Sequence, residues 1–341
     1  MTQIRVVLLA LASTSISIGS LHAQVLATGG FLANDAFRIL VTGVPAGGAW
    51  KLQTSQTFSN WTDLPGASLQ PGDNVVVDPA PVSLRYYRAI TETPVRLYSS
   101  NAVGFIKLNV PAGFKMIANQ LVRGDNRIGT IMVPPESTAL YKFSPVTGGY
   151  RCASYVDGAW EGDDPEMTLA PGEGAFLYSP RAWVLKLDGE VLLSALVSMG
   201  YGFSITASPW PFAGPLDGVL PQGLCIHQFN PATGGYRQNC YNDRAWEGDG
   251  GGSAAPQLSV GESFFIYNPG GRDKSGGYWV LAVQKSSKRP ERMQQRRAMM
   301  ALAPRTDQRM PDCLRRSPMT VRQPASTTPE PTKNFWARYS A

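Results

Sequence analysis

The sequence is poor in the residues on which nucleophilic catalysis and metal binding most often depend. Histidine occurs only twice, as His22 and His227, and His22 lies in the predicted signal peptide described below. A Ser-His-Asp or Cys-His arrangement would therefore rest on His227 alone, and no Gly-x-Ser-x-Gly motif accompanies it. The four cysteines form no Cys-x-x-Cys pair and no Cys/His spacing typical of a metal site. We expect no catalytic residues and no metal site.

A phosphate-binding loop and a long helical period are also missing. The glycine-rich run at 248–252 is followed by Ser253-Ala254-Ala255, without the Gly-Lys-Ser/Thr that binds phosphate and Mg²⁺. This absence argues against a nucleotide, and no cofactor is expected. No window of the folded part keeps a 3.6-residue apolar period, so the sequence predicts little helix.

The longest apolar run stands at the N-terminus. Arg5 precedes the apolar and small-residue run 6–18, and Leu21-His22-Ala23 forms a small-residue cleavage site before Gln24. This order predicts a signal peptide over residues 1–23. The run is too short and too rich in Ser and Thr to span a bilayer, and no later segment is apolar enough to do so. We therefore expect export to the cell surface or extracellular space, without a transmembrane segment.

Positive charge is concentrated at one end of the chain. The whole sequence carries a formal charge of +6, but residues 286–341 contain 12 basic and 4 acidic residues. The remainder has 19 basic and 21 acidic residues, a net charge of −2, so no nucleic-acid partner is expected. Few aromatics and no strand alternation in 286–341 predict a disordered basic tail. Such a tail either binds an anionic polymer or envelope, or is out-of-frame, unevolved sequence.

A duplication dominates the middle of the chain. Residues 143–163 (FSPVTGGYRCASYVDGAWEGD) match 229–249 (FNPATGGYRQNCYNDRAWEGD) at 14 of 21 positions, with an offset of 86. Flanking motifs match at an offset of 89: FKMIA at 114–118 with FSITA at 203–207, and PGEGAFLYSP at 171–180 with VGESFFIYNP at 260–269. A unit of about 90 residues is too long for a solenoid repeat and suits a small domain or one half of a pseudo-symmetric domain.

Short strand-like runs separated by Gly, Pro, Asn and Asp set the fold class. In the first unit these runs are Phe37–Val41, Trp50–Thr54, Asn74–Val77 and Leu84–Arg88. The sequence predicts an all-β protein with a small β-sandwich-like module at 24–92. Two duplicated β modules, copy one at 96–186 and copy two at 187–285, follow it and are related by a pseudo-twofold axis. Each has a hairpin at its Thr-Gly-Gly turn, where glycine supplies positive φ.

One disulfide follows from hairpin register. If Phe229 faces Tyr236 across the turn, Cys225 faces Cys240, because both pairs sum to 465. Opposed residues in a non-hydrogen-bonded pair come close enough for a cross-strand disulfide, and an exported protein permits one. The alternative is two buried free thiols. Cys152 has no cysteine counterpart in copy two, where Gln238 stands.

The motifs of the two copies, and the order in which they occur, resemble those of secreted repeat proteins abundant in Verrucomicrobia and related bacteria. The shared pattern is GFKMIANQL, LYKFSPVTGGY, a Trp loop (WEGDDPEMTLAPGEGAFLYSP) and GEVL, over residues 98–285. Residues 52–90, with LQTSQTFSNWTDLPGAS and LRYYRAI, resemble a small β module of the same proteins. The resemblance implies secretion and a cell-surface or extracellular setting, and it implies no reaction.

Carboxylates gather in the two Trp loops. Copy one contains Glu161, Asp163, Asp164 and Glu166, whereas copy two keeps only Glu247 and Asp249. Paired carboxylates hydrolyse glycosides at suitable separation, and oxygen-rich loops bind Ca²⁺. The simpler interpretation is a turn in which Asp and Glu cap backbone amides, because copy two replaces Asp164 and Glu166 with glycines.

Recurring aromatic residues are the candidate ligand contacts: Tyr150 and Trp160 in copy one, Tyr236 and Trp246 in copy two. Exposed, they would form a platform for sugar rings. The alternative is that they are core or cross-strand residues. The sequence thus predicts a secreted, non-enzymatic structural or adhesive surface protein. A carbohydrate-binding protein that uses these aromatics is the alternative, with polysaccharide or a cell-envelope component as partner, and a glycoside hydrolase is a remote third.

Overall fold

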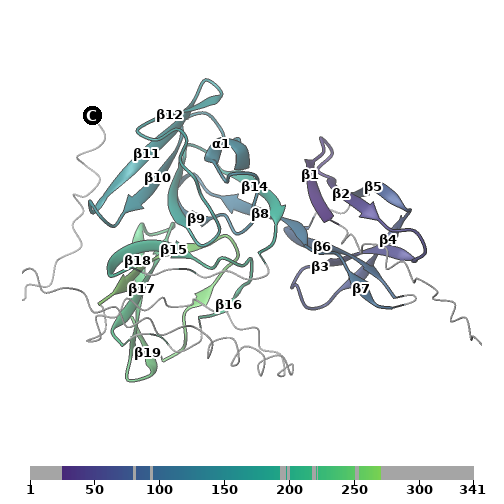
Figure 1. Cartoon of the computed structure of the whole chain (residues 1–341). Coiled ribbons are helices and arrows are strands. Elements are labelled where there is room, and N and C mark those ends of the chain that lie inside the picture. Colours follow the sequence, from purple (N-terminus) through teal and green to yellow (C-terminus); the bar gives the residue numbers. More distant parts are fainter. Residues whose placement is uncertain are drawn as a thin grey trace, which may run out of the picture. The chain divides into compact units, whose positions relative to one another are not determined.

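A computed structural model describes residues 25–79, 82–92, 95–192, 197, 200–216, 220, 222–249 and 253–269. The predicted signal peptide (1–23) and the predicted disordered tail (286–341) lie outside the described residues. Within them the fold is all-β, as the sequence predicts, and its strands form five antiparallel sheets (Figure 1). The described residues contain one short helix, α1 (Ile128–Ile131).

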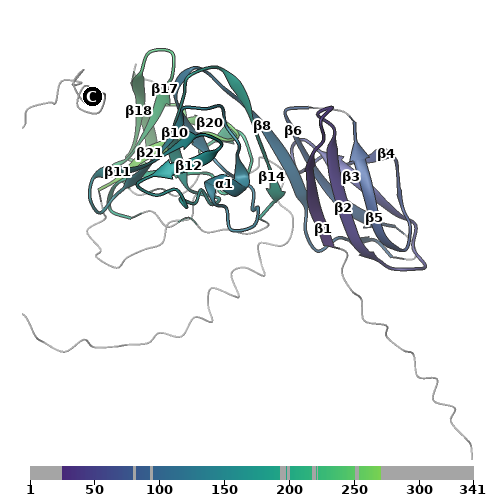
Figure 2. The same ribbon diagram turned by 90° about the horizontal axis from the view of Figure 1, so that it is seen from above.

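The first unit is a β-sandwich (Figure 2). One layer has the strand order β1-β2-β5 and the other contains β3, β4 and β6. Side chains alternate along β2: Phe37, Ile39 and Val41 are buried, whereas Arg38 and Thr42 are exposed. This period of two places one face of the strand in the core. The bounds are β1 (Val25–Phe31), β2 (Phe37–Val44), β3 (Trp50–Ser55), β4 (Thr62–Leu69), β5 (Gly72–Asp78) and β6 (Leu84–Thr91).

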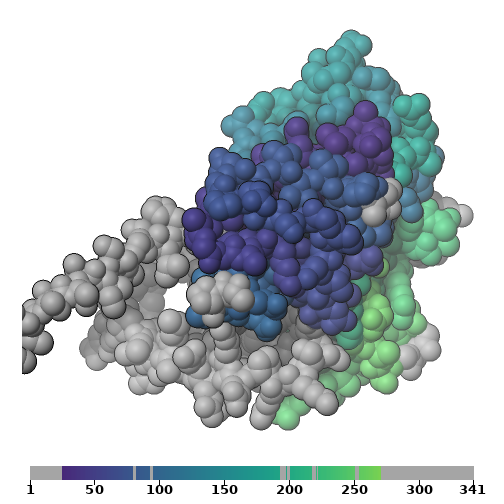
Figure 3. Space-filling view, turned by 90° about the vertical axis from the view of Figure 1, so that its right-hand side faces the viewer, coloured from purple at the N-terminus to yellow at the C-terminus, as the bar shows by residue number. Residues whose placement is uncertain are grey.

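The sandwich core is aromatic. Phe37, Tyr87 and Phe105 pack together, and the rings of Phe37 and Phe105 lie 4.7 Å apart between centroids. The hydroxyl of Tyr87 donates to Asp78 at 2.6 Å, and Arg85 pairs with the same carboxylate oxygen at 2.5 Å. A buried carboxylate therefore receives both a hydrogen bond and a charge partner, which burial of a charge requires. The surface of this unit, purple to blue, faces the viewer in Figure 3.

Strand β8 (Val103–Val110) is shared by the first unit and copy one. It pairs with β6 on one side and with β14 (Trp183–Glu190) on the other, in the six-stranded sheet β14-β8-β6-β3-β4, where β7 (Leu97–Tyr98) also pairs with β6. Val103 and Phe105 enter the sandwich core, while Ile106 and Leu108 enter the core of copy one. The predicted boundary between 92 and 96 therefore falls within one sheet, and the boundary at 186/187 falls inside β14.

The two copies have five-stranded sheets of equivalent order. Copy one has β12-β11-β10-β13-β9 and copy two has β19-β18-β17-β21-β15. Copy one consists of β9 (Gly113–Ala118), β10 (Thr138–Ser144), β11 (Gly149–Val156), β12 (Ala159–Gly162) and β13 (Gly174–Ser179). Copy two consists of β15 (Gly202–Ala207), β17 (Leu224–Asn230), β18 (Gly235–Asn242), β19 (Ala245–Gly248) and β21 (Ser263–Asn268), with a small sheet of β16 (Gly214–Pro215) and β20 (Gln257–Leu258).

A pseudo-twofold axis relates the copies, and the contacts between them are reciprocal. The amide of Ala118 donates to the Gly261 carbonyl at 2.9 Å, and the equivalent amide of Ala207 donates to the Gly172 carbonyl at 3.0 Å. Ring contacts are exchanged in the same way: Phe176 meets Phe229 at 5.3 Å and Phe143 meets Phe265 at 5.5 Å, both edge to face. Such self-complementary contacts are those of an isologous interface.

Each copy has a hydrophobic core in its described residues. Copy one shares a core of 18 buried residues with β8 and β14, centred on side chains such as Ile117, Leu140 and Leu177. Among the residues that the structure describes, the core cluster of copy two contains 8 buried residues, among them Leu224, Ile226 and Phe264. Most positions of copy two that correspond to β8 and β14, at 192–199 and 272–279, lie outside the described residues.

Candidate binding surface of the two copies

Each five-stranded sheet turns one face to its core and carries aromatic residues on the other, called the outer aromatic face below. In copy one, Leu140, Ala153 and Leu177 point into the core, so their strand neighbours point away. The cross-strand pairs Phe114↔Tyr178, Tyr141↔Phe176 and Phe143↔Tyr150 make up the outer aromatic face of copy one. The equivalent residues of copy two are Phe203, Tyr267, His227, Phe265, Phe229 and Tyr236.

The centres of the two outer aromatic faces meet at the pseudo-twofold axis. Phe176 is fully buried there, and its ring lies 6.2 Å from that of Tyr150. Tyr236 packs against Phe229 at 5.5 Å but keeps 45% of its surface exposed. Burial raises the pKa of both tyrosines, that of Tyr236 to about 12, so both stay neutral at physiological pH. Aromatic packing thus joins the copies and leaves part of Tyr236 open.

The outer ends of these faces remain exposed. In copy two, Phe203 is 48% exposed and its ring lies 4.8 Å from Tyr267, which is 36% exposed. In copy one, Tyr178 is 36% exposed and lies 5.1 Å from Phe114. Each copy therefore has a pair of adjacent, tilted rings at an equivalent position, with at least one ring of the pair exposed to solvent. This arrangement is suited to contact with another surface.

The predicted platform of Tyr150, Trp160, Tyr236 and Trp246 is divided between opposite sides of the sheets. Trp246 is only 6% exposed, packs on Tyr241 and donates its indole N–H to the Leu216 carbonyl at 3.3 Å. Trp160 packs against the core of copy one and against Tyr155. Because side chains alternate along a strand, Tyr150 and Tyr155 face opposite sides of β11. Trp160 pairs with Tyr155 across β11 and β12 and therefore lies on the same side of the sheet as Tyr155. Trp246 is therefore a core residue and Trp160 is a partly buried residue at the edge of the core, and neither indole joins the tyrosines.

The carboxylates of the Trp loops have structural partners. Asp249 and the backbone of Gln238 exchange two hydrogen bonds, at 2.8 Å and 3.0 Å, and Asp163 accepts from the Cys152 amide at 3.4 Å. Asp164 pairs with Arg151 at 2.8 Å, and Glu247 accepts from the side chain of Asn242 at 2.7 Å. These contacts fit the interpretation of Trp-Glu-Gly-Asp as a capped turn that fixes an edge strand.

The Gly-Glu turn, whose glutamate sequence reasoning did not single out, works in the same way in both copies. Glu173 accepts from the Ala170 amide at 2.8 Å and pairs with Lys142 at 2.8 Å. Glu262 accepts from the Ser259 amide at 2.8 Å, with Gln228 in the place of lysine. Recurrence of Glu next to a turn glycine in both repeats was the available signal.

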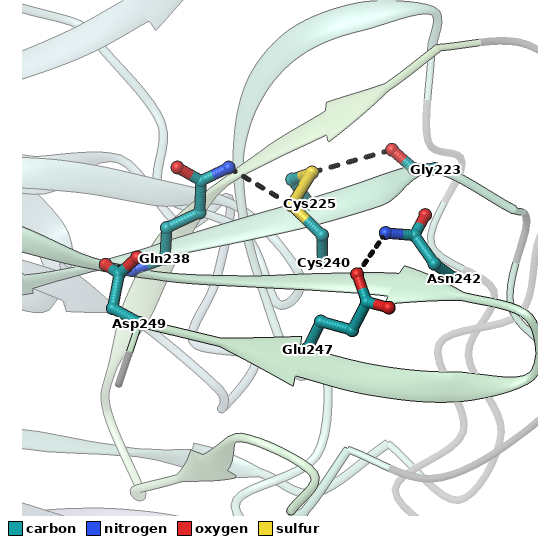
Figure 4. The surroundings of a disulfide bond; sticks show 7 residues. All are labelled: Gly223, Cys225, Gln238, Cys240, Asn242, Glu247 and Asp249. Carbon is teal, nitrogen blue, oxygen red and sulfur yellow. Dashed lines mark hydrogen bonds between the residues drawn. A yellow bond between two sulfur atoms is a disulfide. The ribbon is translucent and has the colours of Figure 1, made fainter. Parts of the chain in front are cut away.

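Cys225 and Cys240 lie opposite each other across the hairpin of β17 and β18 and form a disulfide (Figure 4). Their Cα atoms are 4.0 Å apart, slightly closer than the usual range. The register is the one predicted from the hairpin. The bond lies on the outer aromatic face, because Cys225 also pairs with Tyr267 across β21. The side-chain amide of Gln238 donates to the Cys240 sulfur at 3.1 Å.

Two groups with potential reactivity, Cys152 and His227, also lie on the outer aromatic faces. Cys152 is a free, partly exposed thiol whose pKa is raised by burial, which lowers its nucleophilicity at neutral pH. Burial also lowers the pKa of His227, beside Phe203. Over the described ranges, no cluster of three or more His, Cys, Asp or Glu side chains suits a metal ion. Within the same residues, no helix has the length and apolar character needed to cross a membrane.

Comparison with known proteins gives no relative. No family model, curated protein or solved structure matches the chain. The geometry of the outer aromatic faces is therefore the ground on which a function is inferred.

Proposed function

We propose that the protein is a secreted, non-enzymatic protein of the cell surface or extracellular space, with a structural or adhesive role. Its contact surface is the exposed part of the two outer aromatic faces. The observation that carries this proposal is a pair of adjacent, tilted aromatic rings at equivalent positions of both copies, Phe203 with Tyr267 and Phe114 with Tyr178. All of these rings except the partly buried Phe114 are exposed to solvent. Rigid aromatic rings supply large contact area at low entropic cost.

The surroundings of the polar groups support a non-enzymatic role. Asp163, Asp249 and Glu173 accept hydrogen bonds from backbone amides, which holds them as parts of turns. His227 packs beside an exposed phenylalanine ring. A general base needs a second group that it activates within hydrogen-bond reach, and the contacts above serve the fold instead.

The test is co-sedimentation of the full chain with isolated cell envelopes and with insoluble polysaccharides. We expect binding, and we expect the double variant Phe203→Ser/Tyr267→Ser to weaken it about tenfold, because two exposed rings at about 0.5–1 kcal/mol each are removed. Val75→Ser is the matched control, since Val75 is 65% exposed on β5 of the first unit. Equal binding of wild type and double variant would disprove the assigned surface.

Carbohydrate binding is the second candidate function. It is favoured by the exposed tyrosines Tyr178, Tyr236 and Tyr267, whose rings offer flat faces to sugars. Hydrolysis of the bound glycan is a separate question, answered by release of reducing ends from the same polysaccharides. We expect no release, and steady release that survives repurification would overturn the non-enzymatic proposal.

A further inference from the structure

A cleft of about 320 Å³ lies at the junction of the two copies. Copy one contributes Pro145 from the β10–β11 turn, together with Pro171 and Glu173 from the Gly-Glu turn. Copy two contributes Tyr201, which directly precedes β15, and Ser204 within β15. The volume is at the lower end of the range for small-molecule sites, which suits one or two sugar rings.

The floor of this cleft is held by hydrogen bonds between the copies. The carbonyl of Gly172 accepts from the Ala207 amide at 3.0 Å and from the Thr206 hydroxyl at 3.1 Å. The backbones of Glu173 and Thr206 also form an isolated antiparallel β-bridge. Gly172 has φ +93°, which favours glycine, and a Cβ there would lie 2.9 Å from Val197. The turn of copy one is thereby fixed against β15, so the cleft is largely pre-formed.

Glu173 supplies an oriented acceptor in the wall. One carboxylate oxygen contacts Lys142 at 2.8 Å and the other accepts from the Ala170 amide at 2.8 Å. The side chain is still 38% exposed, and each oxygen has a further lone pair for a ligand hydroxyl. Because Lys142 balances its charge, this wall favours an uncharged ligand over an anion or a cation.

Tyr201 and Ser204 add a stacking face and a second polar contact. Tyr201 is 59% exposed, the largest exposure among the exposed aromatic residues of the described ranges. Ser204 is partly exposed, and its hydroxyl both donates and accepts. An aromatic ring beside a carboxylate and a hydroxyl matches a pyranose, which has an apolar C–H face and a rim of hydroxyls.

The pseudo-twofold equivalent of this cleft carries different side chains. Leu108 stands in the place of Val197, Ala112 in the place of Tyr201 and Lys115 in the place of Ser204. Leu108 contacts Gly261, where a Cβ would lie 2.4 Å from its methyl groups, and Lys115 is partly buried with its ammonium donating to the Asn109 carbonyl at 2.6 Å. The cleft thus differs from its equivalent in two ways: Val197 is smaller than Leu108, and Tyr201 adds an aromatic ring where the other copy has Ala112.

We propose that this cleft is a binding site for a neutral pyranose unit of a glycan. The sugar ring stacks on Tyr201, and its hydroxyls contact Glu173 and Ser204. The site rests on the carbohydrate-binding candidate function and specifies its ligand class. Phe203 stands between Tyr201 and Ser204 in the chain, but neither Phe203 nor Tyr267 lines the cleft, so different substitutions test the two assignments.

The test is titration of the full chain with neutral oligosaccharides (cellotetraose, mannotetraose and the N-acetylglucosamine tetramer), followed by calorimetry or ligand-observed NMR up to millimolar concentration. We expect at least one to bind, and Tyr201→Ala to weaken that binding about tenfold, since one aromatic contact contributes about 0.5–1.5 kcal/mol. Ser204→Lys, which introduces the residue of the equivalent position, is expected to abolish it.

Tyr98→Ala is the matched control, because Tyr98 is 46% exposed and belongs to the first unit. Circular dichroism of each variant is the control for folding. The proposal is overturned if none of the neutral oligosaccharides binds, if tetragalacturonate binds more tightly than they do, or if Tyr201→Ala binds as well as wild type. If Tyr201→Ala loses oligosaccharide binding but keeps envelope binding, the adhesive proposal stands independently of the cleft. If Phe203→Ser/Tyr267→Ser loses envelope binding but keeps oligosaccharide binding, the cleft proposal stands independently of the adhesive surface.

Discussion

Copy one and copy two share a strand order but differ in covalent cross-linking. In the described residues, the sheet of copy one packs against β8 and β14 and has no disulfide, whereas the sheet of copy two contains the Cys225–Cys240 disulfide. At the positions of Cys225 and Cys240, copy one has Ala139 and Ser154. The comparison teaches that the same sheet order accepts either a covalent cross-link, which constrains the unfolded state, or Ala and Ser at the same pair of positions.

Removing the disulfide should have the largest effect on this comparison. Cys225→Ala/Cys240→Ser gives copy two the residues of copy one and opens a loop of 15 residues. We expect a loss of about 3 kcal/mol in the free energy of unfolding of copy two, measured by urea denaturation. Cys152→Ser is the control and should change little. If reduction with dithiothreitol leaves the wild-type transition in place, the disulfide does not stabilise copy two.

An exchange of one core residue should have the next largest effect. Asn239 is 1% exposed, and its Nδ2 has no hydrogen-bond partner among the described residues, whereas copy one has the fully buried Ala153 at that position. An unsatisfied buried amide costs about 1–3 kcal/mol. We therefore expect Asn239→Ala to stabilise copy two by at least about 1 kcal/mol, and Ala153→Asn to destabilise copy one. If thermal melts show that Asn239→Ala destabilises the protein or that Ala153→Asn stabilises it, the unsatisfied amide of Asn239 is not the cause.

A turn substitution should have a smaller effect. The hairpin between β18 and β19 places Arg244 at φ +65°, where copy one has Gly158 at φ +80°. Positive φ costs a non-glycine residue about 1 kcal/mol or slightly more. Arg244→Gly should therefore stabilise copy two by about that amount, and Gly158→Arg should destabilise copy one equally. Arg237→Gly, within β18, is the control for loss of charge and is expected to destabilise. A destabilised Arg244→Gly protein would show that the arginine makes a compensating contact.

The smallest effect is a pH dependence confined to copy two. His227 occupies the place of Tyr141, and burial lowers its pKa. As the pH falls through about 6.5, the unfolded chain binds the proton before the folded chain does, so stability is lost towards acid. His227→Tyr should reduce this loss between pH 7 and pH 5 in denaturation curves. An unchanged slope would assign the acid sensitivity to other groups, such as the nearby Asp249.

Alternation and turns allowed much of this fold to be predicted. β2, β3, β5 and β6 contain the predicted runs, and each Thr-Gly-Gly turn connects a hairpin. β1 and β4 gave no such pattern, because Gly29-Gly30 and Pro65-Gly66 lie inside them. Glycine and proline weaken a strand pattern, and both strands have register shifts in their pairing.

The contacts between units were harder to predict than the units. Strand β8 has buried residues on both faces, VGFIKLNV, which indicates burial but not the two cores that receive it. The division of the predicted aromatic platform follows from a period of two, because Tyr155 is five positions, an odd number, after Tyr150. Only the pairing of Trp160 with Tyr155 across the next strand, which depends on tertiary structure, places the indole in the core.

The position of β8 restricts how such a chain grows during evolution. A third copy inserted between the first unit and copy one would separate β6 from β8 and strip Val103 and Phe105 from the core they complete. A copy added after β21 disturbs none of these contacts. Lineages that lengthen this protein by tandem duplication are therefore expected to gain repeats after copy two in the sequence. The first unit and copy one are expected to remain adjacent in all of them.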